Sequence, residues 1–176
     1  MNRKKIVAII LTTFLLVISL VGCIGSNNKT NINSNDSKVQ ENVENQCAFN
    51  ELKTYVGKTY NEVSENKGVG SEKIEDIEGK KVIVSSSYST RMFNYNANLI
   101  LELDDSKNVS VVSVHFKGIE PENILENIKK VLGEPKVSKD KENGDFKVYS
   151  WEKDGYQYKL SEVGEETIIT VNKNAI

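Results

Sequence analysis

Residues 99–116, with the sequence LILELDDSKNVSVVSVHF, decide the fold expected for this chain. Leucines alternate with other residues at the start of this stretch, a polar turn follows, and the next run is rich in valine. Alternation with a period of two is typical of a strand that buries one face, and β-branched residues favour strands. Residues 156–171, YQYKLSEVGEETIITV, repeat the whole pattern 57 positions later without a gap. The two stretches therefore predict two similar β-hairpins.

A further strand is expected before each hairpin. Residues 81–88 and 146–152 are the candidates, because apolar and β-branched residues are frequent in both. The second of these strands is joined to its hairpin by Asp154-Gly155, which is a signal for a tight turn. A longer, aromatic loop at residues 89–98 is expected to make the first connection.

Helix signals precede both sets of strands. The second helix is the clearer, because Pro121 stands at its start, apolar residues at helical spacing form one stripe, and Gly133 follows its end. The first helix is weaker and ends before Gly68. We therefore expect an α+β fold built from two repeats, residues 48–118 and 119–176. Each repeat is one helix followed by a three-stranded meander, and the helices pack on one face of an antiparallel sheet.

The amino terminus has the pattern of a bacterial lipoprotein signal. Basic residues in the first five positions precede an apolar run at residues 6–21, and the small residue Gly22 stands directly before Cys23. This pattern predicts a signal peptide over residues 1–22, cleavage between Gly22 and Cys23, and a lipid on the Cys23 thiol. That lipid then holds the mature protein on the extracytoplasmic face of a cell membrane. An uncleaved membrane anchor and plain secretion are the alternatives.

Residues 23–47 comprise the lipidated cysteine and a polar spacer rich in Asn, Ser, Lys and Glu. Such a segment cannot bury enough apolar surface to offset the entropy of ordering, so we expect the spacer to be disordered. Removal of the three basic residues of the signal leaves 20 basic and 25 acidic side chains, a net charge of about −5. This charge gives no support for a nucleic-acid partner, which requires a clustered basic face. The preference for Lys over Arg and the abundance of Asn suggest a low-GC bacterium.

The sequence offers little for catalysis or metal binding. With Cys23 lipidated, we expect Cys47 to be a spare thiol at the edge of the domain, with a reactive nucleophile or an intermolecular bridge as the alternatives. The Cys/His spacing of a zinc site is missing, and we expect neither a metal nor another cofactor. His115 is the only histidine and has no nucleophile motif beside it, so we expect no catalytic residues and a protein that is not an enzyme. The alternative is a cell-envelope enzyme with a site that folding assembles around His115. A small-molecule or peptidoglycan sensor is a third possibility, but the sequence contains no residue signature of one.

The sequence GKTYNEV at residues 57–63, closed by Gly68, stands at the start of the first predicted repeat. Together with the lipoprotein signal, the spacer and the short meander, this motif resembles the β-lactamase inhibitory protein and the small outer-membrane lipoprotein A (SmpA/OmlA) group. The resemblance covers most of residues 49–171 and departs from that pattern at Lys67, where an apolar residue usually precedes the closing glycine. The inhibitor's disulfides also cannot form in this sequence. The resemblance implies a protein without enzymatic activity that binds another protein through its sheet face and loops, but inhibition of β-lactamase itself is not carried over.

Aromatic residues are the best candidates for a binding surface, because Tyr and Trp give a large contact area at low entropic cost. The alternative for each of these residues is burial in the hydrophobic core. The sequence thus predicts a membrane-anchored lipoprotein that acts as a non-catalytic protein-binding module, of the inhibitor or scaffold kind, with a protein partner that the sequence does not identify. The candidate surface residues surround the two predicted hairpins and are Tyr88, Phe93, Tyr95, Tyr149 and Trp151.

Overall fold

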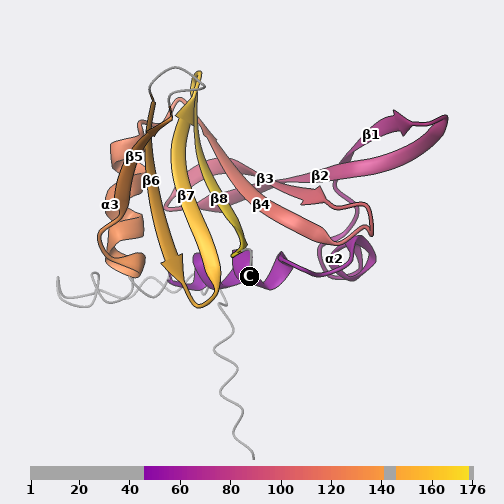
Figure 1. Ribbon diagram of the computed structural model, residues 1–176, viewed down its shortest axis with the longest axis horizontal. Helices are drawn as coiled ribbons and strands as arrows, with labels where there is room; N and C mark the ends of the chain where they lie inside the picture. Colours follow the sequence, from indigo (N-terminus) through magenta and orange to yellow (C-terminus); the bar gives the residue numbers. More distant parts are fainter. Residues whose placement is uncertain (1–45, 141–145, 175–176) are drawn as a thin grey trace, which may run out of the picture.

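The computed structural model describes residues 46–140 and 146–174, and Figure 1 shows how their helices and strands are arranged. The predicted signal peptide, Cys23 and almost all of the predicted spacer lie outside the described residues. In the part of the chain that is described, no helix is both long and apolar enough to cross a membrane. In chain order, the described elements are a helix at residues 46–55, α2 (Tyr60–Lys67), β1 (Ser71–Ile77), β2 (Lys80–Met92), β3 (Tyr95–Leu103), β4 (Val109–Lys117), α3 (Pro121–Leu132), β5 (Lys136–Asp140), β6 (Phe146–Lys153), β7 (Tyr156–Val163) and β8 (Glu166–Lys173).

All of these strands belong to one antiparallel sheet with the order β1-β2-β3-β4-β8-β7-β6-β5. β4 and β8 lie at its centre, where Val112 is paired with Val171 and Val114 with Ile169. A meander that ended at β4 would leave a row of backbone N–H and C=O groups without partners in the middle of the protein. The pairing of β4 with β8 satisfies these groups and joins the two halves of the chain.

The predicted architecture of two helix-plus-three-strand repeats, with helices on one face of the sheet, is therefore wrong. The described residues form a single eight-stranded sheet with four strands from each half, and three helices accompany it. The sequence pattern missed β1 and β5, which are the two edge strands of the sheet. Their described side chains are exposed, so neither strand shows the alternation that reveals a half-buried strand.

The connection between β2 and β3 also differs from the expected loop. Residues 89–98 belong to these two strands except for a turn at Phe93-Asn94, where φ is 52° and 67°. Positive φ at both positions is typical of a type I′ hairpin turn, which Asn tolerates and Phe rarely adopts. The rings of Phe49 and Phe116 lie 5.9 and 6.4 Å from the Phe93 ring and hold it in place. Tertiary packing therefore stabilises a turn that the sequence does not reveal.

The core is built from the central strands together with the helix at residues 46–55 and α3. The helix at residues 46–55 contributes Phe49 and Leu52, and α3 contributes Ile124 and Ile128. Full burial of an apolar side chain of this size stabilises the fold by about 1.5–3 kcal/mol. The alternate residues of the same strands point to the other face of the sheet. The most deeply buried apolar strand residues are Leu99, Leu101, Val109, Val112, Val114, Phe116, Tyr158, Leu160, Ile169 and Val171.

α2 is positioned by hydrogen bonds at its first turn. The Thr59 hydroxyl accepts a hydrogen bond from the Glu62 backbone N–H, and the Glu62 carboxylate accepts one from the Thr59 backbone N–H at 2.8 Å. The Thr59 backbone N–H and the Thr59 hydroxyl both donate to the Glu62 carboxylate, and they hold the pKa of the Glu62 carboxyl below its usual range. Gly68, with a φ of 85°, ends the helix, and the chain continues into β1.

Candidate functional site

The five aromatic candidates do not gather on an exposed surface. Tyr149 and Trp151 are buried in the core, with 8% and 5% of their surface exposed. The Trp151 indole N–H donates a hydrogen bond to the backbone carbonyl of Gly133 at 2.8 Å, so its polar atom is also used inside the protein. A partner cannot reach these two side chains while the domain stays folded. The other three candidates are partly buried and pack against the core: Tyr88, Phe93 and Tyr95.

Lys67 stands where the resembled family usually has an apolar residue, and its neighbours explain why a lysine fits there. Its ammonium group lies 3.2 Å from a Glu51 carboxylate oxygen and 5.3 and 5.9 Å from the ring centroids of Tyr55 and Tyr88. Burial lowers the pKa of Lys67, but the Tyr55 hydroxyl and the Glu51 carboxylate outweigh burial, so the pKa is raised overall. The apolar stem of lysine can cover the aromatic rings while its charged end joins the helix at residues 46–55 to α2.

Cys47 is disulfide-bonded, so the expectation of a spare thiol is wrong. The sequence has one other cysteine, Cys23, which lies outside the described residues. One sulfur atom cannot carry both a lipid thioether and a disulfide. Within a single chain, lipidation of Cys23 and a disulfide from Cys23 to Cys47 therefore exclude each other.

His115 takes part in a hydrogen-bonded chain of three side chains across β4 and β8. Its Nδ1 lies 2.9 Å from Oε2 of Glu166, and its Nε2 lies 3.0 Å from Oγ of Ser113. A neutral imidazole with its proton on Nδ1 satisfies both contacts, because it donates to the carboxylate and accepts from the Ser113 hydroxyl. Hydrolases activate a serine nucleophile with the same three kinds of group.

The surroundings of Ser113 do not complete a hydrolase site. Ser113 lies between Ile100 of β3 and Thr170 of β8 in the sheet, and only 4% of its surface is exposed. The backbone N–H groups around it are engaged in strand pairing, whereas acyl transfer requires N–H donors that are free to stabilise an oxyanion. The three side chains thus act as a cross-strand link between β4 and β8.

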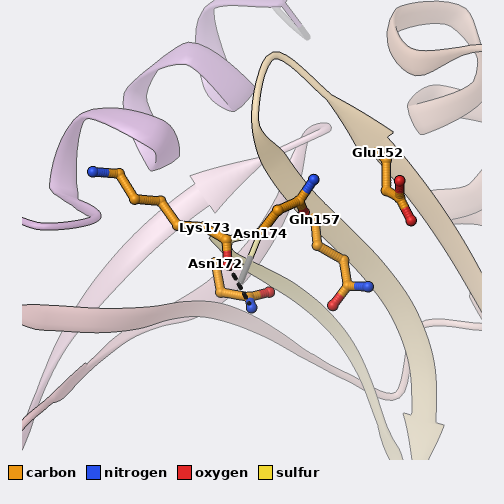
Figure 2. Close-up of a pocket in the computed structure, with 5 residues that line it drawn as sticks. All are labelled: Glu152, Gln157, Asn172, Lys173 and Asn174. Carbon is orange, nitrogen blue, oxygen red and sulfur yellow. Dashed lines mark hydrogen bonds between the residues drawn. The ribbon is translucent and has the colours of Figure 1, made fainter. Parts of the chain in front are cut away.

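A hollow of about 450 Å³ lies where β6 ends, β7 begins and β8 ends. Figure 2 shows the Lys173 side chain leading away from the other lining side chains, toward a helix. The hollow can hydrogen-bond a polar group, but it contains neither His115 nor a serine or cysteine nucleophile. Among the described residues, no three His, Cys, Asp or Glu side chains are grouped so that they could hold a metal ion. The lining residues are Glu152, Gln157, Asn172, Lys173 and Asn174.

The hairpin of β1 and β2 carries a fully exposed strand, β1, which sequence reasoning missed. Figure 1 shows its distal part extending beyond the rest of the sheet. β1 pairs with β2 on one side and forms the edge of the sheet on the other, and all of its residues are exposed. The hairpin turns at Glu78-Gly79, where both residues have positive φ, and the Asp76 carboxylate accepts a hydrogen bond from the Gly79 N–H at 2.8 Å. An Asp three residues before a turn glycine is the sequence signal that could have indicated this hairpin.

Two tyrosine hydroxyls tie the base of the hairpin to the domain. The Tyr60 hydroxyl on α2 donates a hydrogen bond to the Glu72 carboxylate on β1. Burial and this hydrogen bond raise the pKa of Tyr60 to about 12, so the hydroxyl stays protonated and able to donate at neutral pH. The Tyr88 hydroxyl on β2 donates to the backbone carbonyl of Gly68 at 3.1 Å. These contacts fix the direction in which β1 leaves the domain.

Comparisons with known proteins do not assign the chain to a family. No family model matches it, and no curated protein matches it either. Among solved structures, the chain is similar to the crystal structure of a DUF4309 family protein, YjgB, from Bacillus subtilis subsp. subtilis str. 168. That match has 14% sequence identity and a TM-score of 0.43, and it covers 66% of this chain and 78% of YjgB. A likeness of this size assigns neither a fold nor a function to this chain.

Proposed function

We propose that this chain is a membrane-anchored extracytoplasmic lipoprotein whose folded domain is a non-catalytic protein-binding module. The observation that supports this function is the exposed edge of β1 in the projecting hairpin. An exposed strand edge presents a row of backbone N–H and C=O groups, on which an extended segment of another protein can add as a further strand. A lipid on Cys23 would keep this edge close to the membrane and to other proteins of the cell envelope, and the disulfide of Cys47 would then join a cysteine of another chain.

The side chains of β1 support the addition of a strand that contains apolar residues. Ile74 and Ile77 are 52% and 46% exposed, although large aliphatic side chains are usually buried. They are three positions apart, so they point to opposite faces of the sheet. A segment added along β1 would cover both. Backbone hydrogen bonds then supply affinity, and the two isoleucines favour apolar residues in the partner.

We expect a photo-crosslinking side chain at Ile74 or Ile77 to join the lipoprotein to one protein partner in cells, because both positions lie beside the added strand. A crosslinker at Lys73 is expected to give the same product. When Ile74→Lys and Ile77→Lys are combined, this product should decrease about ten-fold, which corresponds to about 1.4 kcal/mol of binding free energy. Charged side chains oppose the pairing of an exposed edge. Gel electrophoresis and mass spectrometry of the products measure the effect.

Val163 is the matched control for this experiment. It is an aliphatic residue of similar exposure, 57%, and it lies at the end of β7 rather than on β1. A crosslinker there should not give the product formed from Ile74. Equal products from both positions, or no product from either position on β1, would contradict the binding role of this strand.

For the anchor, we expect an alkyne-tagged fatty acid fed to the cells to label the wild-type protein and the Cys47→Ser variant but not the Cys23→Ser variant. The reason is that the lipid is attached through the sulfur of Cys23. Mass spectrometry of the amino-terminal peptide identifies the modified atom. A mature peptide with Cys23 in a disulfide to Cys47, and without lipid, would refute the anchor.

The chain of Ser113, His115 and Glu166 favours a second candidate, a cell-envelope hydrolase with Ser113 as its nucleophile. A fluorophosphonate that labels Ser113 in the wild-type protein, but not in a His115→Gln variant, would support this enzyme over the binding module. Because the backbone N–H groups around Ser113 are engaged in the sheet, we expect no labelling.

A further inference from the structure

The two edges of the sheet carry opposite charge. β1 has three acidic residues and one lysine, whereas β5 has two lysines and one aspartate. The side chains of β1 are exposed, and so are those of residues 136–139 in β5. Figure 1 shows the two strands on opposite sides of the molecule. We infer that β1 of one copy pairs with β5 of a second copy, so that the lipoprotein assembles head to tail. This inference names the partner and rests on the proposed role of β1 as a pairing edge.

One antiparallel register matches both the charges and the apolar residues of the two strands. It sets an exposed aliphatic residue of each strand opposite the other, with 52% of Ile74 and 60% of Val137 accessible in the single copy. Directly opposite residues of an antiparallel pair lie on the same face, with Cβ atoms about 4.5–5.5 Å apart. None of the five residue pairs in this register brings like charges together. The complementary pairs are Ile74 with Val137, Glu75 with Lys136, and Glu72 with Lys139.

The existing contacts of these charged side chains are compatible with the pairing. Glu72 accepts a hydrogen bond from Tyr60, and a carboxylate has further acceptor positions for a lysine. Lys136 lies 3.9 Å from Glu152 in an exposed ion pair, which is weak and easily exchanged for another. Glu75 lies 2.8 Å from the Lys73 ammonium in another exposed ion pair of the same kind. For Glu72, Glu75 and Lys136, the second copy therefore does not have to break a strong interaction in the first.

The same charges oppose the competing arrangements. Charged residues on an edge strand usually prevent that edge from pairing with its own copy. The net charge of β1 is −2, from three acidic residues and one lysine, and that of β5 is +1, from two lysines and one aspartate. Two β1 edges or two β5 edges therefore bring net charges of the same sign together. The pairing of β1 with β5 brings opposite net charges together, which favours the head-to-tail contact over the symmetric dimers. Such a heterologous contact leaves one edge of each kind free and can extend into a ring or a row of copies.

The test uses the full lipoprotein in detergent, with its size measured by analytical ultracentrifugation over a range of concentrations. The acid-swapped variant combines Glu72→Lys and Glu75→Lys, and the base-swapped variant combines Lys136→Glu and Lys139→Glu. We expect the wild-type protein to associate as its concentration rises. Each swapped variant alone should require a concentration at least about ten-fold higher, because both of its edges then have the same sign.

Mixing the two variants restores opposite charges at every contact. An equimolar mixture is therefore expected to associate as the wild-type protein does. Lys159→Glu, a charge reversal at an exposed position of the interior strand β7, is the control and should leave association unchanged. Circular dichroism shows whether each variant is folded. Swapped variants that are folded and associate like the wild-type protein, or a mixture that stays monomeric, would overturn the inference.

A carbodiimide crosslinker, which joins lysine to a neighbouring carboxylate, tests the register. In a mixture of ¹⁴N- and ¹⁵N-labelled copies, we expect mixed-isotope links between Glu75 and Lys136 and between Glu72 and Lys139. A wild-type protein that stays monomeric, while Ile74 still crosslinks to a different protein in cells, would refute self-assembly and leave the proposed function standing. A wild-type protein that associates through other residues would also refute self-assembly by these edges.

Discussion

Replacing Phe116 by alanine is expected to lower the free energy of unfolding by about 3–5 kcal/mol. Phe116 lies on β4 in the centre of the sheet and has no exposed surface. Its ring lies 6.4 Å from the ring of Phe93 in a stacked arrangement. Truncation removes apolar contacts, leaves a cavity where the central strands meet the helix at residues 46–55, and withdraws support from the turn at Phe93-Asn94. Denaturation by urea, with the slope and midpoint fitted together, measures the change.

Phe146→Ala is the matched control for this substitution. Phe146 is also a phenylalanine on a strand, but it is 38% exposed at the start of β6. We expect its truncation to cost clearly less, because more than a third of its surface stays in water after folding. Two similar losses would mean that Phe116 is not at the centre of the core. A domain stability of about 5–15 kcal/mol is typical, so Phe116→Ala should leave a marginal fold.

Replacing Gly70 by alanine is expected to destabilise the protein by about 1–3 kcal/mol, the usual cost of an overpacked site. Gly70 connects α2 to β1, and a Cβ atom there would lie 2.5 Å from the Ser86 hydroxyl oxygen and 2.6 Å from the backbone carbonyl oxygen of Ser87. The hydroxyl can rotate away, but the carbonyl belongs to β2 and cannot move without disturbing the pairing of the hairpin. Stability and the hydrogen exchange of β1 amide protons should therefore change together.

Two variants separate this close approach from other effects. Ser71→Ala, at the next and exposed position, is expected to change stability by no more than about 0.5 kcal/mol. Gly70→Ala combined with Ser86→Ala should recover part of the loss, because it removes the hydroxyl contact and keeps the carbonyl contact. A Gly70→Ala protein with normal stability and normal exchange in β1 would show that β2 does not approach this residue so closely. Loss of partner crosslinking at Ile74 in a folded Gly70→Ala protein would connect the position of β1 to binding.

Elements with a strong local pattern were predictable from the sequence. α3 begins at Pro121 and is closed by Gly133, as the spacing of its apolar residues and these two residues predict. Of the alternating leucines of β3, Leu99 and Leu101 are buried as expected and Leu103 is partly buried, because a period of two places them on one face. The exposed edge strands β1 and β5 gave no such signal. The surface on which the proposed function depends could therefore not be predicted from the periodicity of the side chains.

Contacts between distant residues could not be predicted from one sequence. The link from Ser113 and His115 to Glu166 forms because β4 and β8 are neighbours, although Glu166 is 51 positions from His115. The disulfide state of Cys47 was predicted wrongly, since the lipoprotein pattern had already assigned the other cysteine to a lipid. The contact of His115 with Glu166 depends on which distant strands meet, and local preferences carry no information about that.

The sequence by itself determined where most strands and α3 lie, because side-chain spacing and turn residues act over a few positions. It also showed that Tyr149 and Trp151 share one face of their strand and Phe146 the other, but not which face is inside. The tertiary structure decided this by placing Trp151 where its indole N–H reaches the Gly133 carbonyl and leaving Phe146 partly exposed. It also decided that one sheet forms, because β4 and β8 hydrogen-bond through backbone groups that every sequence carries. Backbone groups are the same in all strands, so their pairing is chosen by the packing of the whole chain rather than by local sequence.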